Sequence, residues 1–261
     1  MTVDEEELAD EARRRGDMVA ARVHLERAVV QAAADGDPDR TAAVRVGLAL
    51  VVAGAGDFAE ALGLLEQAGA GSAAVHARAQ SQRALVLQRL GRLDEAARQW
   101  RTALRTWRRL GDPASVARVL NNRGLLHAYR GDLRAAAADL DRAGALYRGL
   151  PDRELESAEV VHNQGFVASR GGDVAGALRL FDRAAEAFER LGVRRPETML
   201  DRCEALLAAQ LAAEALAVGL QALTELENQG RAADLAEAMV LVAEAALGAG
   251  RAAEAATLAG R

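Results

Sequence analysis

The chain has 261 residues, of which 51% are hydrophobic but only 3% are aromatic, and all 33 basic residues are arginine. Alanine and leucine supply most of the apolar content, which favours closely packed helices over sheets, since strands prefer β-branched and aromatic residues. The single cysteine, Cys203, excludes an intrachain disulfide. The acidic N-terminus does not resemble a signal peptide, and no apolar run is long enough to span a bilayer. We therefore expect a soluble cytoplasmic protein.

Along the chain, amphipathic helical stretches alternate with two kinds of turn. A glycine followed by Asp or Arg recurs about every 40 residues, at Gly16, Gly56, Gly91, Gly131, Gly172 and Gly250, with a degenerate copy at Gln210-Leu211. The glycine supplies the left-handed residue that ends one helix, and an Asp after it caps the next helix. Other breakers, such as Asp37-Pro38 and Asp112-Pro113, separate the resulting helical hairpins.

No hairpin of this kind buries its own apolar face, so neighbouring hairpins must stack. We expect an all-α fold, a right-handed α-solenoid of about seven hairpins, forming a single domain over residues 1–261. The expected repeats cover approximately residues 3–34, 38–68, 73–110, 113–149, 153–191, 196–229 and 232–261. In the second repeat we expect the second helix, roughly residues 58–67, to be short by about a turn and a half. We also expect the last repeat to be truncated.

Charge is distributed unevenly along the chain. Residues 78–153 carry 16 Arg against 7 acidic residues, whereas the whole chain has a net charge of −5. This basic segment predicts attraction to an acidic partner, unless its arginines only solvate an outer helix face. Nucleic acid is a less favoured partner, because Trp100 and Trp107 lie on the apolar face of their helix, opposite its arginines, where they cannot stack on bases.

Few residues are suited to catalysis. His162 and Cys203 fall in successive first helices, so a contact between them is conceivable. However, Cys203 occupies the position that is Gly124 and Gly165 in neighbouring repeats, which favours a small buried core cysteine. The 4 histidines lie far apart without a carboxylate cluster, and the absence of lysine excludes a Walker A motif. We expect no enzymatic activity, no metal site and no cofactor.

The repeats resemble tetratricopeptide repeats. The first-helix marks are Asn122-Arg123-Gly124-Leu125-Leu126-His127 before Gly131-Asp132, and Asn163-Gln164-Gly165-Phe166 before Gly172-Asp173; second-helix marks are Ala96, Trp100 and Ala103. This resemblance covers nearly the whole chain and implies a solenoid that binds a protein or peptide. The chain departs from the family at the position before the first-helix glycine, which is usually Leu. That position holds Arg83, Arg123, Gln164 and Arg202.

Residues 120–258 also resemble the N-terminal repeat region of bacterial CHAT-domain proteins, in which a repeat array precedes a caspase-like peptidase domain. The segments that carry this resemblance are residues 121–127, 161–168 and 200–207. It implies that the chain is a non-catalytic recognition or regulatory arm of a caspase-like effector. The alternatives are a stand-alone adaptor that dimerises and, less favoured, a nucleic-acid-binding solenoid.

Aligning the repeats on the turn glycine places one set of first-helix residues on the expected concave surface. They are Arg78, Gln82, Arg89, Arg118, Asn122, Tyr129, His162, Asn163, Arg170 and Asp201, with Glu159 and Glu197 beside them. The resemblance implies that Asn122 and Asn163 hydrogen-bond the backbone of an extended peptide, as Asn does at this position in peptide-binding members of the family. The alternative is that each bonds a neighbouring helix or is solvated. We expect the four arginines to be solvated or paired with Glu159 and Asp201, and to attract an acidic segment.

Overall fold

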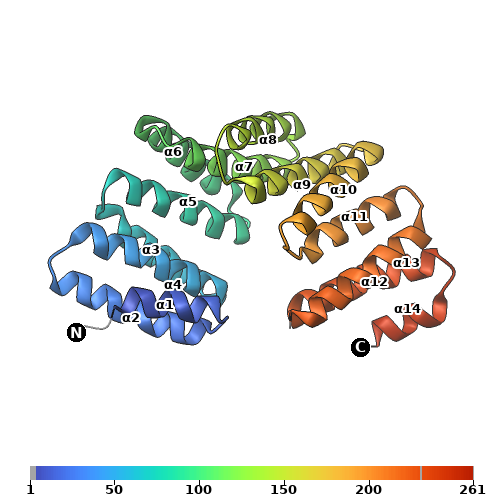
Figure 1. Cartoon of the computed structure of the whole chain (residues 1–261), viewed down its shortest axis with the longest axis horizontal. Helices are drawn as coiled ribbons and strands as arrows, with labels where there is room; N and C mark the ends of the chain where they lie inside the picture. Colours follow the sequence, from blue (N-terminus) through green and yellow to red (C-terminus); the bar gives the residue numbers. More distant parts are fainter. Residues whose placement is uncertain (1–3, 230, 261) are drawn as a thin grey trace. The chain divides into compact units, whose positions relative to one another are not determined.

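The computed structural model describes residues 4–229 and 231–260, and every regular element within them is helical. The helices pair in chain order into hairpins, which confirms the all-α solenoid (Figure 1). Their bounds are α1 Glu5–Arg14 and α2 Met18–Ala34; α3 Pro38–Gly54 and α4 Phe58–Gln67; α5 Ala73–Arg89 and α6 Leu93–Leu110; α7 Pro113–Tyr129 and α8 Leu133–Arg148; α9 Glu154–Arg170 and α10 Val174–Arg190; α11 Pro196–Ala208 and α12 Ala212–Asn228; and α13 Ala232–Gly248 and α14 Ala252–Ala259. A short 3₁₀ helix, η1 (Ala68–Ala70), follows α4, which is short as expected.

The turns inside the hairpins have the expected chemistry. Gly56 has a φ of 90°, a conformation that glycine adopts readily and other residues avoid. The side chain of Asp57 then accepts a hydrogen bond of 3.0 Å from the backbone N–H of Glu60 and so caps α4. In the degenerate turn Gln210 takes the same left-handed region, with a φ of 61°. Where Arg replaces the capping Asp, as at Arg92, its guanidinium pairs with a glutamate three residues on.

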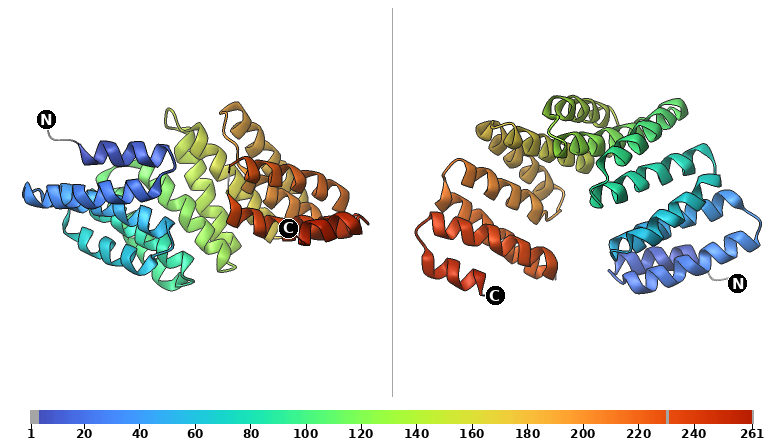
Figure 2. Two further views of the ribbon diagram at one scale, coloured as in Figure 1. Left: turned by 90° about the horizontal axis from the view of Figure 1, so that it is seen from below. Right: turned by 180° about the vertical axis from the view of Figure 1, so that it is seen from behind.

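The helices form two compact units, Met1–Val119 and Leu120–Arg261, and the division between them falls within α7. In unit 1, α3 packs against α2, α4 and α5, and Val46 and Val52 are among the buried core residues. In unit 2, the hairpins α9–α10, α11–α12 and α13–α14 pack in chain order, as the views in Figure 2 also show. Because hairpins that are neighbours in sequence are neighbours in space within each unit, the stacking is that of a solenoid.

Trp100 and Trp107 on α6 are 1% and 5% exposed, which confirms that they belong to the core. Burial of the tryptophans leaves the arginines of α6 on its outer face. None of the helices in the described part of the chain combines the length and apolar character needed to cross a membrane.

Three of the four polar residues at this family position, Arg123, Gln164 and Arg202, have acidic partners on second helices. Arg202 on α11 pairs with Asp182 on α10 at 2.9 Å, and Gln164 on α9 donates a hydrogen bond of 2.8 Å to Asp141 on α8. Both acids lie ten residues after the turn glycine of the preceding repeat. Arg123 instead reaches Asp139 on α8, within its own hairpin. These first helices are therefore joined to second helices by polar contacts where the family usually places a leucine.

Candidate functional site

The predicted site residues of unit 2 lie on successive first helices. Tyr129 ends α7, His162 and Arg170 belong to α9, and Asp201 belongs to α11. Phe166, which was not among the predicted site residues, lies between His162 and Arg170 and joins the others. We call the surface formed by Asn122, Tyr129, His162, Phe166, Arg170 and Asp201 the first-helix face of unit 2.

An aromatic and cationic group occupies the centre of this face. The ring centroids of Tyr129 and Phe166 are 5.7 Å apart with the planes tilted by 54°, an arrangement that aromatic pairs prefer. The guanidinium carbon of Arg170 lies 5.9 Å from the centroid of the Phe166 ring, within cation–π range. Tyr129 remains 52% exposed, so part of its side chain is available to a ligand.

Electrostatic interactions connect Asp201 to this group. Burial of the hydroxyl and, after it, the nearby charge of Asp201 raise the pKa of Tyr129 above its ordinary value, while Arg170 opposes this shift. The phenol therefore stays protonated at neutral pH and can donate a hydrogen bond. Arg170 is exposed and forms no ion pair within the described residues, so its guanidinium is free to bind an anionic group.

Two polar pairs join neighbouring first helices in a regular ladder. Nδ2 of Asn163 on α9 donates to Oδ1 of Asn121 on α7 at 2.8 Å. One repeat later, Oδ2 of Asp201 on α11 lies 3.1 Å from Nε2 of His162 on α9. Asn163 and Asp201 hold the same repeat position as Asn122, and their partners Asn121 and His162 hold the position directly before it. The ladder fixes how the first helices of unit 2 lie against each other.

The two asparagines that we expected to share one role differ. Asn163 is 8% exposed and its amide is engaged by Asn121, so the structure favours the alternative reading in which it bonds a neighbouring helix. Asn122 is half-buried, and its side chain makes no hydrogen bond within the described residues. Asn122 also lies two helical turns from Tyr129 on the same face of α7. Of the two, only Asn122 is free to bond a peptide backbone.

The predicted site residues of unit 1 lie at the surface but form no cluster with one another. Arg78 and Arg89 on α5 and Arg118 on α7 are exposed, as is Arg170 in unit 2, which confirms that these arginines are solvated. Gln82 is half-buried. Arg118 donates a hydrogen bond of 3.3 Å to Oγ of Ser115 in its own helix.

Of the two alternatives for these arginines, pairing with Glu159 and Asp201 is not the one that the structure shows. Glu159 pairs with Arg195, and Glu197 pairs in the same way with Arg231. Arg195 and Arg231 directly precede the first helices α11 and α13, so each reaches back to the preceding first helix. These ion pairs lie toward the N-terminal ends of the first helices, and among the described residues Arg170 has no acidic partner. The carboxylate of Asp201 contacts His162 instead.

The structure gives no support to a catalytic pair of His162 and Cys203. Cys203 is fully buried, and its burial raises the pKa of the thiol to about 11, so the reactive thiolate is absent at neutral pH. His162 contacts Asp201 and the ring of Phe181. Among the described residues, no three His, Cys, Asp or Glu side chains group closely enough to hold a metal ion.

Two contributors to the site were missed from sequence. The signal for Phe166 was its spacing, because residues 162, 166 and 170 follow each other at intervals of four and so share one helix face. Asn121 carried no comparable signal, because its role depends on how α7 and α9 are rotated against each other.

Comparisons with known proteins agree with this architecture. Residues 75–149 match the family model described as tetratricopeptide repeat. No curated protein sequence is significantly similar to the chain.

Three solved structures illustrate the similarity in fold. A tetratricopeptide repeat protein from Parabacteroides merdae is 17% identical with a TM-score of 0.62, and the match covers 97% of this chain and 89% of that one. A Rap protein complexed with Competence and Sporulation Factor is 16% identical with a TM-score of 0.71, covering 96% and 70%. A STAND protein with a tetratricopeptide repeat sensor from Pyrococcus horikoshii is 14% identical with a TM-score of 0.71, covering 93% of this chain but only 37% of that one. At these identities the similarity establishes the fold, and the chain folds as a solenoid of tetratricopeptide-like hairpins.

Proposed function

We propose that the chain is a non-catalytic scaffold that binds an extended protein or peptide segment on the first-helix face of unit 2. The observation that carries this proposal is the group formed by the exposed Tyr129 and Arg170 with the half-buried Phe166, in which two rings and a guanidinium meet. Tyrosine and arginine are enriched among the residues that dominate binding energy in interfaces. The tetratricopeptide-like fold is typically a protein-interaction scaffold.

The chemistry of the face defines the expected ligand. An apolar or aromatic side chain of the ligand packs on Tyr129 and Phe166, and an adjacent carboxylate accepts hydrogen bonds from Arg170. The Asn122 amide can both donate to and accept from a peptide backbone. We therefore infer an acidic segment that also carries an apolar anchor.

The relatives in fold support an interaction role of this kind. The Rap protein was solved in complex with Competence and Sporulation Factor, and in the Pyrococcus protein the repeats are described as a sensor. The resemblance of residues 120–258 to CHAT-domain arrays further implies that the chain is the recognition or regulatory arm of a caspase-like peptidase effector.

Selection from a phage-displayed random peptide library on the immobilised protein tests the proposal. We expect enriched peptides to combine an aromatic or large apolar residue with Asp or Glu. Titration calorimetry with an enriched synthetic peptide should show affinity at least about tenfold weaker for Tyr129→Ala and for Arg170→Ala, a loss typical of central interface residues.

Arg179→Ala is the matched control, because Arg179 is an exposed arginine on α10 of the same unit. Its affinity should equal that of the unmodified protein. If Tyr129→Ala and Arg170→Ala bind the selected peptides as tightly as this control, the first-helix face of unit 2 is not the binding site.

A further inference from the structure

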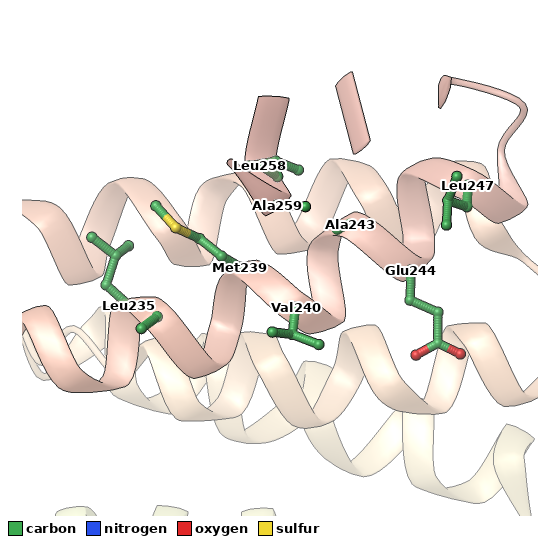
Figure 3. A pocket seen from close by; sticks show the side chains of 9 residues that line it. Leu235, Met239, Val240, Ala243, Glu244, Leu247, Leu258 and Ala259 are labelled. Carbon is green, nitrogen blue, oxygen red and sulfur yellow. The ribbon is translucent and has the colours of Figure 1, made fainter. Parts of the chain in front are cut away.

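One helix face in unit 2 is apolar and uncovered. On α13, Val240 is 72% exposed and Leu247 is 62% exposed, far more than is usual for large apolar side chains. Ala236 and Ala243 complete a stripe with them along the helix. Leu235, Met239, Leu258 and Ala259 extend the stripe into a groove of about 550 Å³ between α13 and α14 (Figure 3).

The equivalent stripe on α11 is covered. Counted back from the turn, the same four positions on α11 are Pro196, Leu200, Cys203 and Leu207, and all four are buried or half-buried. These residues belong to a stack in which the next first helix, α13, packs against both α11 and α12. The stripe on α13 is therefore the surface on which the repeat places a further helix, and within the described residues no helix lies there.

The stripe is complementary to itself. Its members, Ala236, Val240, Ala243 and Leu247, are spaced by four, three and four residues, which is the spacing of a coiled-coil seam. If two copies of α13 lie antiparallel about a two-fold axis between residues 241 and 242, Ala236 of one copy opposes Leu247 of the other. Val240 then opposes Ala243. Each layer sets a small side chain against a large one, which permits close packing.

We propose that a second copy of this chain docks on the seam formed by Ala236, Val240, Ala243 and Leu247, with the two α13 helices antiparallel. Met239 and, from α14, Leu258 lie beside the seam on one side, but both are buried, so the surface offered to the second copy is mainly the seam itself. The resulting interface is apolar in the manner of homodimer interfaces. This inference does not depend on peptide binding at the first-helix face of unit 2.

The other flank of the seam carries a feature that defines the register. Glu237 and Glu244 are both exposed beside the seam. In the antiparallel arrangement, Glu237 of each copy faces Glu244 of the other, and this repulsion in water weakens the dimer without preventing it. The two-fold axis repeats the contact between Glu237 of one copy and Glu244 of the other. Replacing Glu244 by a cationic residue therefore converts two repulsions into two attractions.

Sedimentation equilibrium of the 261-residue protein over a range of concentrations tests the proposal. We expect a reversible monomer–dimer equilibrium. Val240→Arg should weaken it at least tenfold while the circular dichroism spectrum and melting temperature stay unchanged, since residue 240 is exposed in the monomer. Val30→Arg on α2 is the matched control, because Val30 is 70% exposed but lies in unit 1. The control should dimerise like the unmodified protein.

Glu244→Arg tests the register and should tighten the dimer about three- to fivefold at low salt, as expected for two surface ion pairs. The proposal is overturned if the protein is monomeric at every concentration. It is also overturned if Val30→Arg, rather than Val240→Arg, abolishes association, which would place the interface in unit 1. A dimer that Glu244→Arg leaves unchanged or weakens would exclude the antiparallel arrangement.

Discussion

Asp139 on α8 illustrates how a single polar residue can be held inside this fold. It is 4% exposed, and Arg123 on α7 donates two hydrogen bonds to its carboxylate, at 2.6 and 2.7 Å. His127 approaches the same carboxylate at 3.8 Å. Burial lowers the pKa of His127; the charge of Asp139 opposes this shift and that of Arg123 adds to it. The imidazole is therefore neutral at pH 7 and cannot replace the arginine as a cationic partner.

We therefore expect Arg123→Ala to lower the free energy of unfolding by about 2–4 kcal/mol, because it leaves a buried carboxylate without its partner. Urea unfolding followed by circular dichroism measures the loss. The double variant Arg123→Met with Asp139→Leu should recover most of it, since replacing both charges by apolar groups removes the unpaired charge. A single variant as stable as the unmodified protein would show that the pair contributes nothing.

Because of Cys203, the stability of the folded protein should depend on pH in alkaline solution. Burial raises the pKa of its thiol from 9.0 to about 11, so above pH 9 the unfolded chain loses a proton that the folded chain keeps. The stability should fall as the pH rises from about 9 towards about 11. Melting temperatures between pH 8 and 10.5 should decline less steeply for Cys203→Ala than for the unmodified protein. Equal slopes would mean that the thiol is not the cause.

At the scale of the helix, the close approach of the two helices of a hairpin depends on a small residue in the first helix, such as Gly165. A Cβ added at Gly165 on α9 would lie 2.8 Å from two carbons of the buried Phe181 ring on α10. Gly63 on α4 has no atom within 4 Å of the equivalent point. Packing therefore requires glycine at residue 165, whereas at residue 63 glycine is only tolerated.

Gly165→Ala should accordingly destabilise the protein by about 1–3 kcal/mol through overpacking between α9 and α10. Gly63→Ala is its counterpart and should stabilise by about 0.5–1 kcal/mol, because alanine has the higher helix propensity and meets no obstacle. Thermal and urea unfolding of both variants check the two signs. Stabilisation by Gly165→Ala would show that α9 and α10 can separate without cost.

At the scale of the whole molecule, each hairpin is stabilised mainly by its neighbours in the chain. A local defect should therefore loosen nearby hairpins more than distant ones. In Gly165→Ala, native-state hydrogen exchange should accelerate in α9 and α10 and change little in α3 and α4, which belong to unit 1. Equal acceleration in α3 and α4 would instead show that the chain opens as one cooperative unit.

The repeat architecture was predictable from sequence because its determinants are local. The glycine-led turns and the Asp caps, such as Gly56 with Asp57, depend only on residues adjacent in the chain. The short second helix of the second repeat and the burial of Cys203 also follow from comparing one repeat with the next. These features fix the helices and their order without any knowledge of how the hairpins are rotated.

The tertiary structure decided which polar and aromatic groups meet. Asn163 bonds Asn121, Asp201 contacts His162, and the ring of Phe166 packs at a tilt against that of Tyr129. Each contact joins helices about 40 residues apart in the chain, and it forms only at one rotation of neighbouring helices. A linear pattern identifies the exposed positions but does not contain that rotation. For this reason the sequence by itself determined the scaffold, whereas the composition of the binding face emerged only when the helices were packed.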